Sequence, residues 1–393
     1  IIVISGKAGV EVGTQKAWEL CDRYKLPRMV FVTDMDIDNA SYRQIVEDMT
    51  SLYGKKIAPF HLPIRENEKF VGYVNVISET GYRWQGKEGV ECEIPEYNKP
   101  NLQICRDTLM EAVAETSEEF MERYFSGESF SEAEIRAALR TNIDDGTIVP
   151  MSMGSNILGQ GIYTLLDDIV KYLPSPEGRE YAGINMKTKE IFQANFDFAK
   201  AKSAFIFKTI VDPFIGKYSL IKVCSGVLKT DDQMLNYDKD IEEKIGKLYV
   251  MQGSKPIEVS ELHAGDIGAL AKLTGARTGN TLSTKSTPIE YGKTEISVPY
   301  TSKRYKAKNK GDIDKISQSL TKMTHEDLTL RVVNDSENHQ SLLYGMGDQH
   351  LDIVVSRLLN EYKVEIELSQ PKVAFRETIR KKSDVEYKYK KQT

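Results

Sequence analysis

The chain has 393 residues, more than one hydrophobic core usually supports, so we expect about two to four domains. Hydrophobic residues make up 40% of it and charged residues 28%, and no run approaches the roughly 18 apolar residues of a membrane helix. A net charge of -5 argues against a protein that coats nucleic acid without selectivity. The apolar first residues lack a basic leader and a cleavage site, so we expect no secretory signal and a cytoplasmic location.

Residues 1–176 are predicted to form an α/β domain on a mainly parallel sheet. Buried strands at 1–4 and 29–32 flank a helix at 14–24, which is the pattern of a βαβ unit. A helix at 41–53 follows, with a short extended piece at 59–63. A strand at 148–153 and a helix at 162–172, which stops before Pro174, close the domain.

A small antiparallel excursion interrupts the parallel pattern. Alternating Val, Tyr and Ile at 70–84 predict antiparallel strands. One amphipathic helix is expected from about 101 to 125, with its glutamates opposite the apolar stripe. Ser131, with Glu134 three residues later, predicts the start of another helix that ends near Thr141.

The rest of the chain reads as two further domains. Many short strands with regular glycines predict a β-barrel at 177–290. The order strand, helix, strand, strand, helix, strand at 291–371 predicts a ferredoxin-like α+β domain. Residues 372–393 are expected to open a further domain.

The segment Met29–Asp36 is a candidate half of a purine site. An apolar strand runs into two carboxylates, and ligands of α/β sheets lie at the carboxyl ends of parallel strands. An aspartate there can accept two N–H bonds from a guanine edge. The alternative is an ordinary strand-to-loop turn.

Metal chemistry is poorly supported by the sequence. The cysteines at 21, 92, 105 and 224 and the five histidines are scattered, with no pair at ligand spacing. We therefore predict no metal site and no catalytic residue. Glutamates crowd 111–134, and basic residues crowd 303–310 and 380–391, so separate faces could meet separate partners or be solvated charge.

Five separated motifs resemble bacterial translation elongation factor G along the whole chain. They are listed in chain order: Ala8-Gly9-Val10 with Leu26-Pro27-Arg28, Gly154-Ser155 with Tyr172-Leu173-Pro174, Asp212-Pro213-Phe214 with Gly216, Gly345-Met346-Gly347-Asp348, and Lys372-Val373-Ala374-Phe375-Arg376. The resemblance implies the later part of a GTPase domain at 1–176, with an insertion at about 65–125, then the second and third domains and the start of the fourth. It also implies that the glutamate-rich helix faces the stalk proteins of the large ribosomal subunit, unless it is a solvated face.

The phosphate-binding loop of such GTPases is not in this sequence. No Gly-x-x-x-x-Gly-Lys-[Ser/Thr] motif occurs, and the resemblance places the second-switch histidine before Ile1. We expect the chain to be a fragment that does not hydrolyse GTP by itself. GTP or GDP would serve the parent protein, and Mg²⁺ would be bound only with the preceding loops.

The family recognises guanine with Asn-Lys-x-Asp, and Thr33-Asp34-Met35-Asp36 stands there in this chain. The resemblance assigns the base to Thr33, Asp34 and Asp36, with Ser155 and Asn156 supplying backbone N–H groups. Only the last carboxylate is kept, and Asp34 replaces a lysine whose stem packs over the purine. We expect reduced guanine affinity and selectivity.

The resemblance implies a ribosome-dependent GTPase that promotes translocation when intact. Its partners would be ribosomal RNA and proteins and GTP or GDP, with no membrane, and it would act as a monomer. The altered Thr33-Asp34 pair favours an alternative, a ribosome-binding or ribosomal protection factor indifferent to nucleotide. A third reading is a scaffold whose partner is unrelated to translation.

Overall fold

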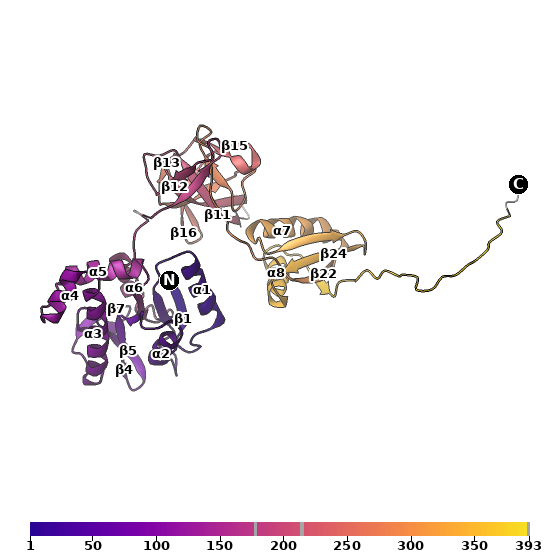
Figure 1. The fold of residues 1–393 in the computed structure, drawn as a ribbon. Coiled ribbons are helices and arrows are strands. Elements are labelled where there is room, and N and C mark those ends of the chain that lie inside the picture. Colours follow the sequence, from indigo (N-terminus) through magenta and orange to yellow (C-terminus); the bar gives the residue numbers. More distant parts are fainter. Residues whose placement is uncertain (177–178, 213–215, 391–393) are drawn as a thin grey trace. The chain divides into compact units, whose positions relative to one another are not determined.

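A computed structural model describes residues 1–176, 179–212 and 216–390 (Figure 1). Two compact units are present, Ile1–Ser175 and Pro176–Thr393. Pro213 and Phe214 of the third motif, and Lys391 of the terminal basic run, lie outside the described residues. No helix of the described part is long and apolar enough to cross a membrane.

The first unit is built on a four-stranded, entirely parallel sheet, which confirms the prediction. The strand order is β1-β2-β8-β3. Every residue of β2 is buried, as expected for a strand that is covered on both faces. The sheet and its helices are β1 (Ile2–Ser5), α1 (Val12–Arg23), β2 (Val30–Thr33), α2 (Tyr42–Tyr53), β3 (Ile57–Pro59), β8 (Val149–Met153) and α6 (Ile162–Tyr172).

Side-chain packing and capping place these helices on the sheet. Trp18 of α1 is buried and stacks on Tyr53 of α2, with ring centroids 3.9 Å apart. The Ser41 side chain accepts a hydrogen bond from the Gln44 N–H and so caps the start of α2. The cap therefore fixes the position at which the loop 34–40 ends and α2 begins.

The insertion begins with an antiparallel meander, as the alternating pattern predicted. Its strands are β4 (His61–Glu66), β5 (Lys69–Asn75), β6 (Thr80–Gln85) and β7 (Glu88–Cys92), paired in that order. A short 3-10 turn, η1 (Glu96–Asn98), leads into the helical part.

The prediction of one helix from 101 to 125 is wrong. The structure has two helices, α3 (Lys99–Ala114) and α4 (Glu118–Phe125). The break occurs because the Ser117 side chain accepts the Phe120 N–H and caps a new helix. The predicted capping box of Ser131 and Glu134 is confirmed at the start of α5 (Glu132–Asp144), which runs three residues past Thr141.

The second unit begins with the all-β region that the sequence predicted. Its main sheet has eight antiparallel strands in the order β15-β14-β20-β11-β12-β19-β16-β17, packed around one apolar core. The strands of this region are β9 (Ala182–Asn185), β10 (Ile191–Gln193), β11 (Ser203–Asp212), β12 (Gly216–Ser225), β13 (Val227–Lys229), β14 (Gln233–Asn236), β15 (Ile241–Lys244), β16 (Leu248–Gln252), β17 (Lys255–Val259), β18 (Glu261–His263), β19 (Ile267–Ala271), β20 (Thr281–Ser283) and β21 (Ile289–Glu290).

A ferredoxin-like arrangement follows, again as predicted. The sheet order β23-β24-β22-β25 is antiparallel throughout, and both helices contribute to its core. The elements are β22 (Thr301–Ala307), α7 (Ile313–Glu326), β23 (Arg331–Asp335), β24 (Gln340–Gly345), α8 (Asp348–Asn360) and β25 (Ile366–Ser369). Residues 371–390 contain no helix or strand.

Candidate functional site

The parallel sheet brings the predicted base-binding residues to one edge. Ser5 at the end of β1 lies opposite Thr33 at the end of β2, and Val32 lies opposite Met153 at the end of β8. Thr33, Asp34 and Asp36 therefore follow one strand, and Ser155 and Asn156 follow its neighbour. We call these five residues the rim.

Backbone hydrogen bonds join the loops of the rim. Gly6 N–H donates to the Thr33 carbonyl at 2.8 Å, and Met35 N–H donates to the Gly154 carbonyl at 3.1 Å. A Cβ on Gly6 would lie 2.8 Å from the same Thr33 oxygen, so the close approach requires glycine. The rim is thus positioned by backbone contacts between three strand ends.

Two rim residues face inward. Thr33 is 9% exposed, and its buried Oγ1 has no hydrogen-bond partner among the described residues. Ser155 is fully buried, its N–H donates to the Gln160 carbonyl at 2.9 Å, and its Oγ accepts the Leu158 N–H. The Ser155 N–H expected to reach a base is therefore already used, whereas Asn156 is exposed.

The two carboxylates of the rim have different environments. Asp34 has a left-handed backbone with φ of 60°, and its Oδ2 accepts the Ser5 hydroxyl at 2.7 Å. Asp36 is exposed, and within the described residues its side chain makes no hydrogen bond or ion pair. Asp36 is thus the carboxylate available to a ligand.

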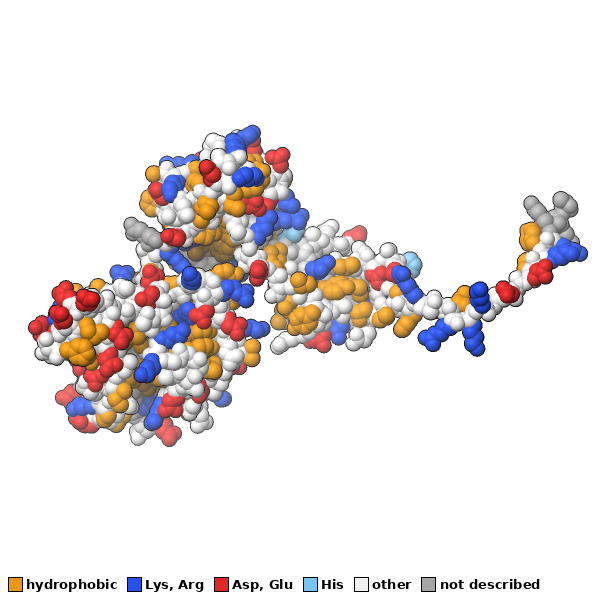
Figure 2. Space-filling view, viewed as in Figure 1, with side chains coloured by type: hydrophobic (Ala, Val, Ile, Leu, Met, Phe, Trp, Pro, Cys, Tyr) orange, Lys and Arg blue, Asp and Glu red, His pale blue; other side chains and the backbone are white. Residues whose placement is uncertain are grey.

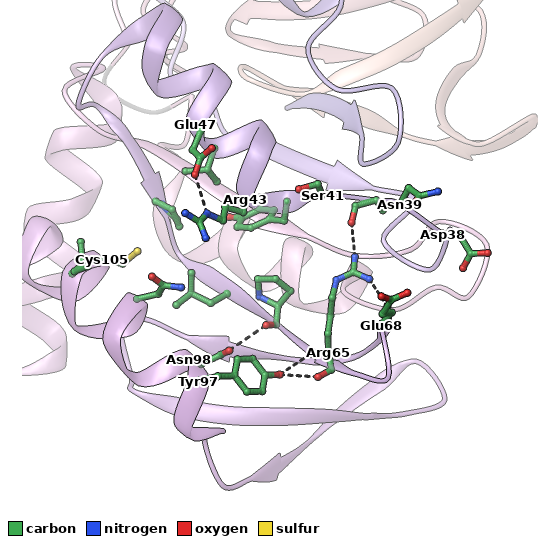
Figure 3. Close-up of a pocket in the computed structure, with 18 residues that line it drawn as sticks. Asp38, Asn39, Ser41, Arg43, Glu47, Arg65, Glu68, Tyr97, Asn98 and Cys105 are labelled. Atoms are coloured by element: carbon green, nitrogen blue, oxygen red, sulfur yellow. Dashed lines mark hydrogen bonds and ion pairs between the residues drawn. The ribbon is translucent and has the colours of Figure 1, made fainter.

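Arg65 holds the loop that carries Asp36, a role that the sequence analysis missed. From β4 of the insertion, its guanidinium donates to the Ala40 carbonyl at 2.8 Å and to the Met35 carbonyl at 3.4 Å. The Tyr97 hydroxyl in turn donates to the Arg65 carbonyl and accepts the Arg65 N–H, both at 2.9 Å (Figure 3). The guanidinium also donates to the Glu68 carbonyl at 2.6 Å. The contact with the Asp36 loop has no local signal in the sequence, because Ala40 and Met35 lie 25 and 30 residues away from Arg65.

A cleft of about 710 Å³ lies beside this loop in the first unit (Figure 3). It is lined by none of the five rim residues. Its lining residues are Asp38, Asn39, Ala40, Ser41, Tyr42, Arg43, Val46, Glu47, Pro59, Leu62, Pro63, Arg65, Glu68, Tyr97, Asn98, Asn101, Ile104 and Cys105.

A buried pair of titratable groups joins the insertion to α6. His61 Nδ1 of β4 lies 3.6 Å from Asp168 Oδ2, and both residues are almost fully buried. Burial, with a smaller contribution from the nearby Lys171, lowers the pKa of His61 to about 3. Burial raises the pKa of Asp168 to about 7. At slightly acidic pH both groups are therefore neutral, and the contact is not an ion pair.

Metal ligands do not gather in the described residues, where no group of three His, Cys, Asp or Glu side chains could hold an ion. Acidic side chains do gather over α3 and α4 (Figure 2). The exposed glutamates there are Glu111, Glu115, Glu118, Glu119 and Glu122.

A parallel α/β domain followed by a β domain and a ferredoxin-like domain is the domain order of translational GTP-binding factors. Three family models match successive segments of the chain. They describe the elongation factor Tu GTP binding domain (residues 1–175), elongation factor G domain 2 (201–285) and elongation factor G, domain III (296–370). The chain belongs to the elongation-factor-G-like proteins.

A solved structure from Thermus thermophilus is similar over nearly the whole chain. The TM-score is 0.80 at 31% sequence identity, and the match covers 94% of this chain and 53% of that one. The chain thus spans about half the length of the solved protein that it matches.

Proposed function

We propose that the chain is part of a ribosome-dependent translation factor that promotes translocation, with GTP or GDP controlling the intact protein. The observation that supports this most is the succession of three matched domains in elongation factor order. A cytoplasmic location and a monomeric state belong to the same proposal.

In this proposal the rim binds the guanine base. Asp36 accepts N–H groups of the base edge through its exposed carboxylate, and Asn156 approaches the same edge from the neighbouring loop. The buried Thr33 and Ser155 support the two loops, and Asp34 is held against Ser5. Phosphate and Mg²⁺ would be bound by loops of the GTPase domain outside this sequence, so binding by the chain alone is weak.

Ribosomal RNA and ribosomal proteins are the proposed macromolecular partners. On β22, Lys306 is exposed and makes no ion pair within the described residues, whereas Lys303 pairs with Asp348. Just after the strand, Lys308 pairs with Glu365. Unpaired cations can bind phosphate, so Lys306 and the basic residues after 380 are the proposed RNA contacts. The exposed glutamates of α3 and α4 are proposed to face the ribosomal stalk.

A second candidate function is a ribosome-binding or protection factor that is indifferent to nucleotide. The specific observation in its favour is Asp34, because its carboxylate stands where relatives carry a lysine. The Ser5 hydroxyl holds that carboxylate at the edge of the sheet, where it would repel a polyphosphate.

Sedimentation with 70S ribosomes tests both candidates. We expect the chain to pellet with ribosomes and to be released as salt rises, because phosphate contacts are screened. Lys306→Glu should weaken the binding, while Lys308→Glu, matched in position but already paired, should weaken it less. A chain that stays in the supernatant at low salt would contradict the proposal. Ribosome binding by the intact protein without ribosome-stimulated GTP turnover would favour the second function.

A further inference from the structure

The second unit contains a pocket in which every charged lining group is a cation. It lies beside β11, and its wall includes the turn before β20 and the segment before β22. Its volume of about 320 Å³ is at the lower end of the range for small-molecule sites, roughly 300–1,000 Å³. Lys239, Arg277 and Lys293 line it, and no acidic side chain is among its described lining residues. The pocket therefore has the size of one small molecule and a positively charged wall.

Two of the three cations have no partner in the described part of the chain. Lys293 Nζ lies 2.7 Å from Asp238 Oδ1, so the charge of Lys293 is balanced within the protein. The side chains of Lys239 and Arg277 are exposed and make no hydrogen bond or ion pair within the described residues. Two unbalanced cations in one pocket favour an occupant with two negative charges, and a phosphate ester has them.

A buried amide joins the backbone segments that carry these two cations. Asn280 is buried, its Oδ1 accepts the Arg277 N–H at 2.9 Å, and its Nδ2 donates to Asp238 Oδ2 at 2.9 Å. Asp238 directly precedes Lys239 in the 3-10 turn η2 (Tyr237–Lys239). Lys239 and Arg277 therefore extend from two segments that one side chain holds together.

Neighbouring groups show that the charge of Arg277 is not balanced. Burial, with smaller contributions from Lys217 and Arg277, lowers the pKa of His325. Lys217 Nζ donates to the Ala276 carbonyl at 2.6 Å, directly before Arg277 in the chain. Burial also lowers the pKa of Lys217, and Arg277 adds to this shift while Glu243 opposes it. An anion beside Arg277 would reduce the repulsion among these groups.

A β-bulge places an aromatic ring in the wall of the pocket. The pairing of β11 with β12 shifts register between Ile206 and Lys208, so Phe207 has no partner in the ladder. Such bulges re-aim side chains and are frequent beside active sites. Phe207 is 40% exposed and lines the pocket together with the exposed Ile296 and Leu328. An exposed aromatic ring with apolar neighbours can stack on the ring of a ligand.

We propose that this pocket binds a small aromatic phosphate ester, a planar ring that carries one phosphate dianion. The phosphate would bind Lys239 and Arg277, and the ring would stack on Phe207. A free metabolite and a nucleotide of an RNA strand share this chemistry. The proposal commits to the free molecule, because about 320 Å³ holds one such group without its chain neighbours. The site lies in the second unit and does not depend on guanine binding at the rim.

Three probes test the proposal on the 393-residue chain. Naphthyl phosphate carries the ring and the dianion, naphthol carries the ring alone, and inorganic phosphate carries the charge alone. We expect naphthyl phosphate to bind at one site per chain, about fivefold or more tighter than either of the other probes. Fluorescence anisotropy follows the naphthyl probes, and phosphorus NMR follows inorganic phosphate.

The charge of the pocket gives the first variant. Arg277→Gln should weaken naphthyl phosphate about two- to fivefold, as for an exposed ion pair, and leave naphthol unchanged. Arg331→Gln is the matched control, since Arg331 is an exposed arginine of β23 outside the pocket. The pKa of His325 should rise when naphthyl phosphate is bound, because an anion beside Arg277 stabilises the imidazolium. His325→Gln assigns the resonance.

The aromatic wall gives the second variant. Phe207→Ala should weaken both naphthyl probes about fivefold and leave the binding of inorganic phosphate unchanged. Phe198→Ala, at a 58% exposed position outside the pocket, should leave all three probes unchanged. Circular dichroism of each variant shows whether it is folded.

Four results would overturn the proposal. One is naphthyl phosphate that binds no tighter than naphthol. Another is an equal effect of Arg277→Gln and Arg331→Gln. A third is a folded Phe207→Ala variant that binds naphthyl phosphate like the wild type. The fourth is a short single-stranded RNA that binds more tightly than naphthyl phosphate and loses affinity in Arg277→Gln, which would assign these cations to nucleic acid.

Discussion

The first unit contains two sets of polar groups that differ in exposure and in partners. At the rim, Asp36 is exposed and makes no bond within the described residues, while the loop around it is held by Arg65 and by backbone bonds. At the junction of β4 and α6, His61 and Asp168 are buried and face each other. Asp36 is therefore a free charge on a fixed loop, where a ligand can bind it. His61 and Asp168 are buried and present no charge to a ligand.

This difference separates groups that contribute to ligand binding from groups that contribute to the stability of the fold. A buried carboxylate keeps its proton because burial disfavours the charged form, so its effect appears in stability. An exposed carboxylate stays hydrated in the folded state, so its charge changes the folding free energy little. Its effect appears in ligand affinity, when a ligand replaces the water around it. Substitutions in the two sets should therefore change different measurements.

The largest effect is expected from Asp168→Asn. The pKa of Asp168 rises to about 7 on folding, so its contribution is full below the unfolded value of 3.8 and is lost as the pH rises towards 7. The stability that Asp168 contributes to the wild type therefore falls by about 4 kcal/mol at most over this range, at 1.36 kcal/mol per pH unit. The asparagine side chain does not titrate, so the variant should gain on the wild type between pH 4 and 7.

His61 titrates with the opposite sign. Its pKa falls from 6.5 to about 3, so stability rises with pH in that window and offsets the loss from Asp168. The stability of the wild type should change little between pH 4 and 6.5, whereas that of the variant should increase with pH. Urea unfolding followed by Trp18 and Trp84, both in the first unit, measures this. Equal pH profiles for Asp168→Asn and its neighbour control Asp167→Asn would refute the prediction.

A smaller loss of stability is expected from Arg65→Met. The change leaves the Met35 and Ala40 carbonyls without their donor and should cost about 2 kcal/mol in the free energy of unfolding. Hydrogen exchange at 35–41 should accelerate. Arg43→Met, which removes only an exposed pair with Glu47, should cost below about 0.5 kcal/mol. Similar costs for the two arginines would show that Arg65 does not hold the loop.

Asp36→Asn should act on binding and leave stability unchanged. It removes the charge that accepts two N–H groups of guanine, so the affinity for GDP should fall at least tenfold, about 1.4 kcal/mol. Binding of ADP should not change. Asp38→Asn, an equally exposed carboxylate two residues later, provides the control. An Asp36 variant that keeps the wild-type preference for GDP over ADP would remove this residue from the proposed site.

The smallest effect should come from Ser5→Ala. The change frees the Asp34 carboxylate from its 2.7 Å hydrogen bond at a half-buried position, at a cost below about 1 kcal/mol. If the serine holds that charge at the rim, GDP binding should improve slightly once the carboxylate can turn to solvent. Titrations of GDP into the variant and the wild type measure this, and weaker binding by the variant would reverse the assigned role of Asp34.

Patterns confined to one segment predicted the fold well. Periodicity identified the parallel sheet, the all-β region and the ferredoxin-like order, and Ser131 with Glu134 marked the start of α5. The break between α3 and α4 carried a local signal too, because Ser117 precedes two glutamates, but the continuous apolar stripe concealed it.

Contacts between distant segments could not be predicted. Arg65 reaches carbonyls 25 and 30 residues away, and His61 meets Asp168 from a strand far earlier in the chain, so no spacing rule links them. The rim was identifiable because consecutive residues follow a strand. The hydrogen bond from the Ser155 N–H to the Gln160 carbonyl could not be predicted, since it depends on the conformation of the turn that contains both residues.

Mapping the contacts of GDP on the chain tests the central claim most directly. Backbone amide chemical shifts should be recorded as GDP is added to millimolar concentration, with ADP as the reference. The account predicts that GDP-specific shifts concentrate at 5–6, 33–36 and 154–156, the loops at the three strand ends. Shifts that are equal for both nucleotides, or that lie away from these loops, would contradict it.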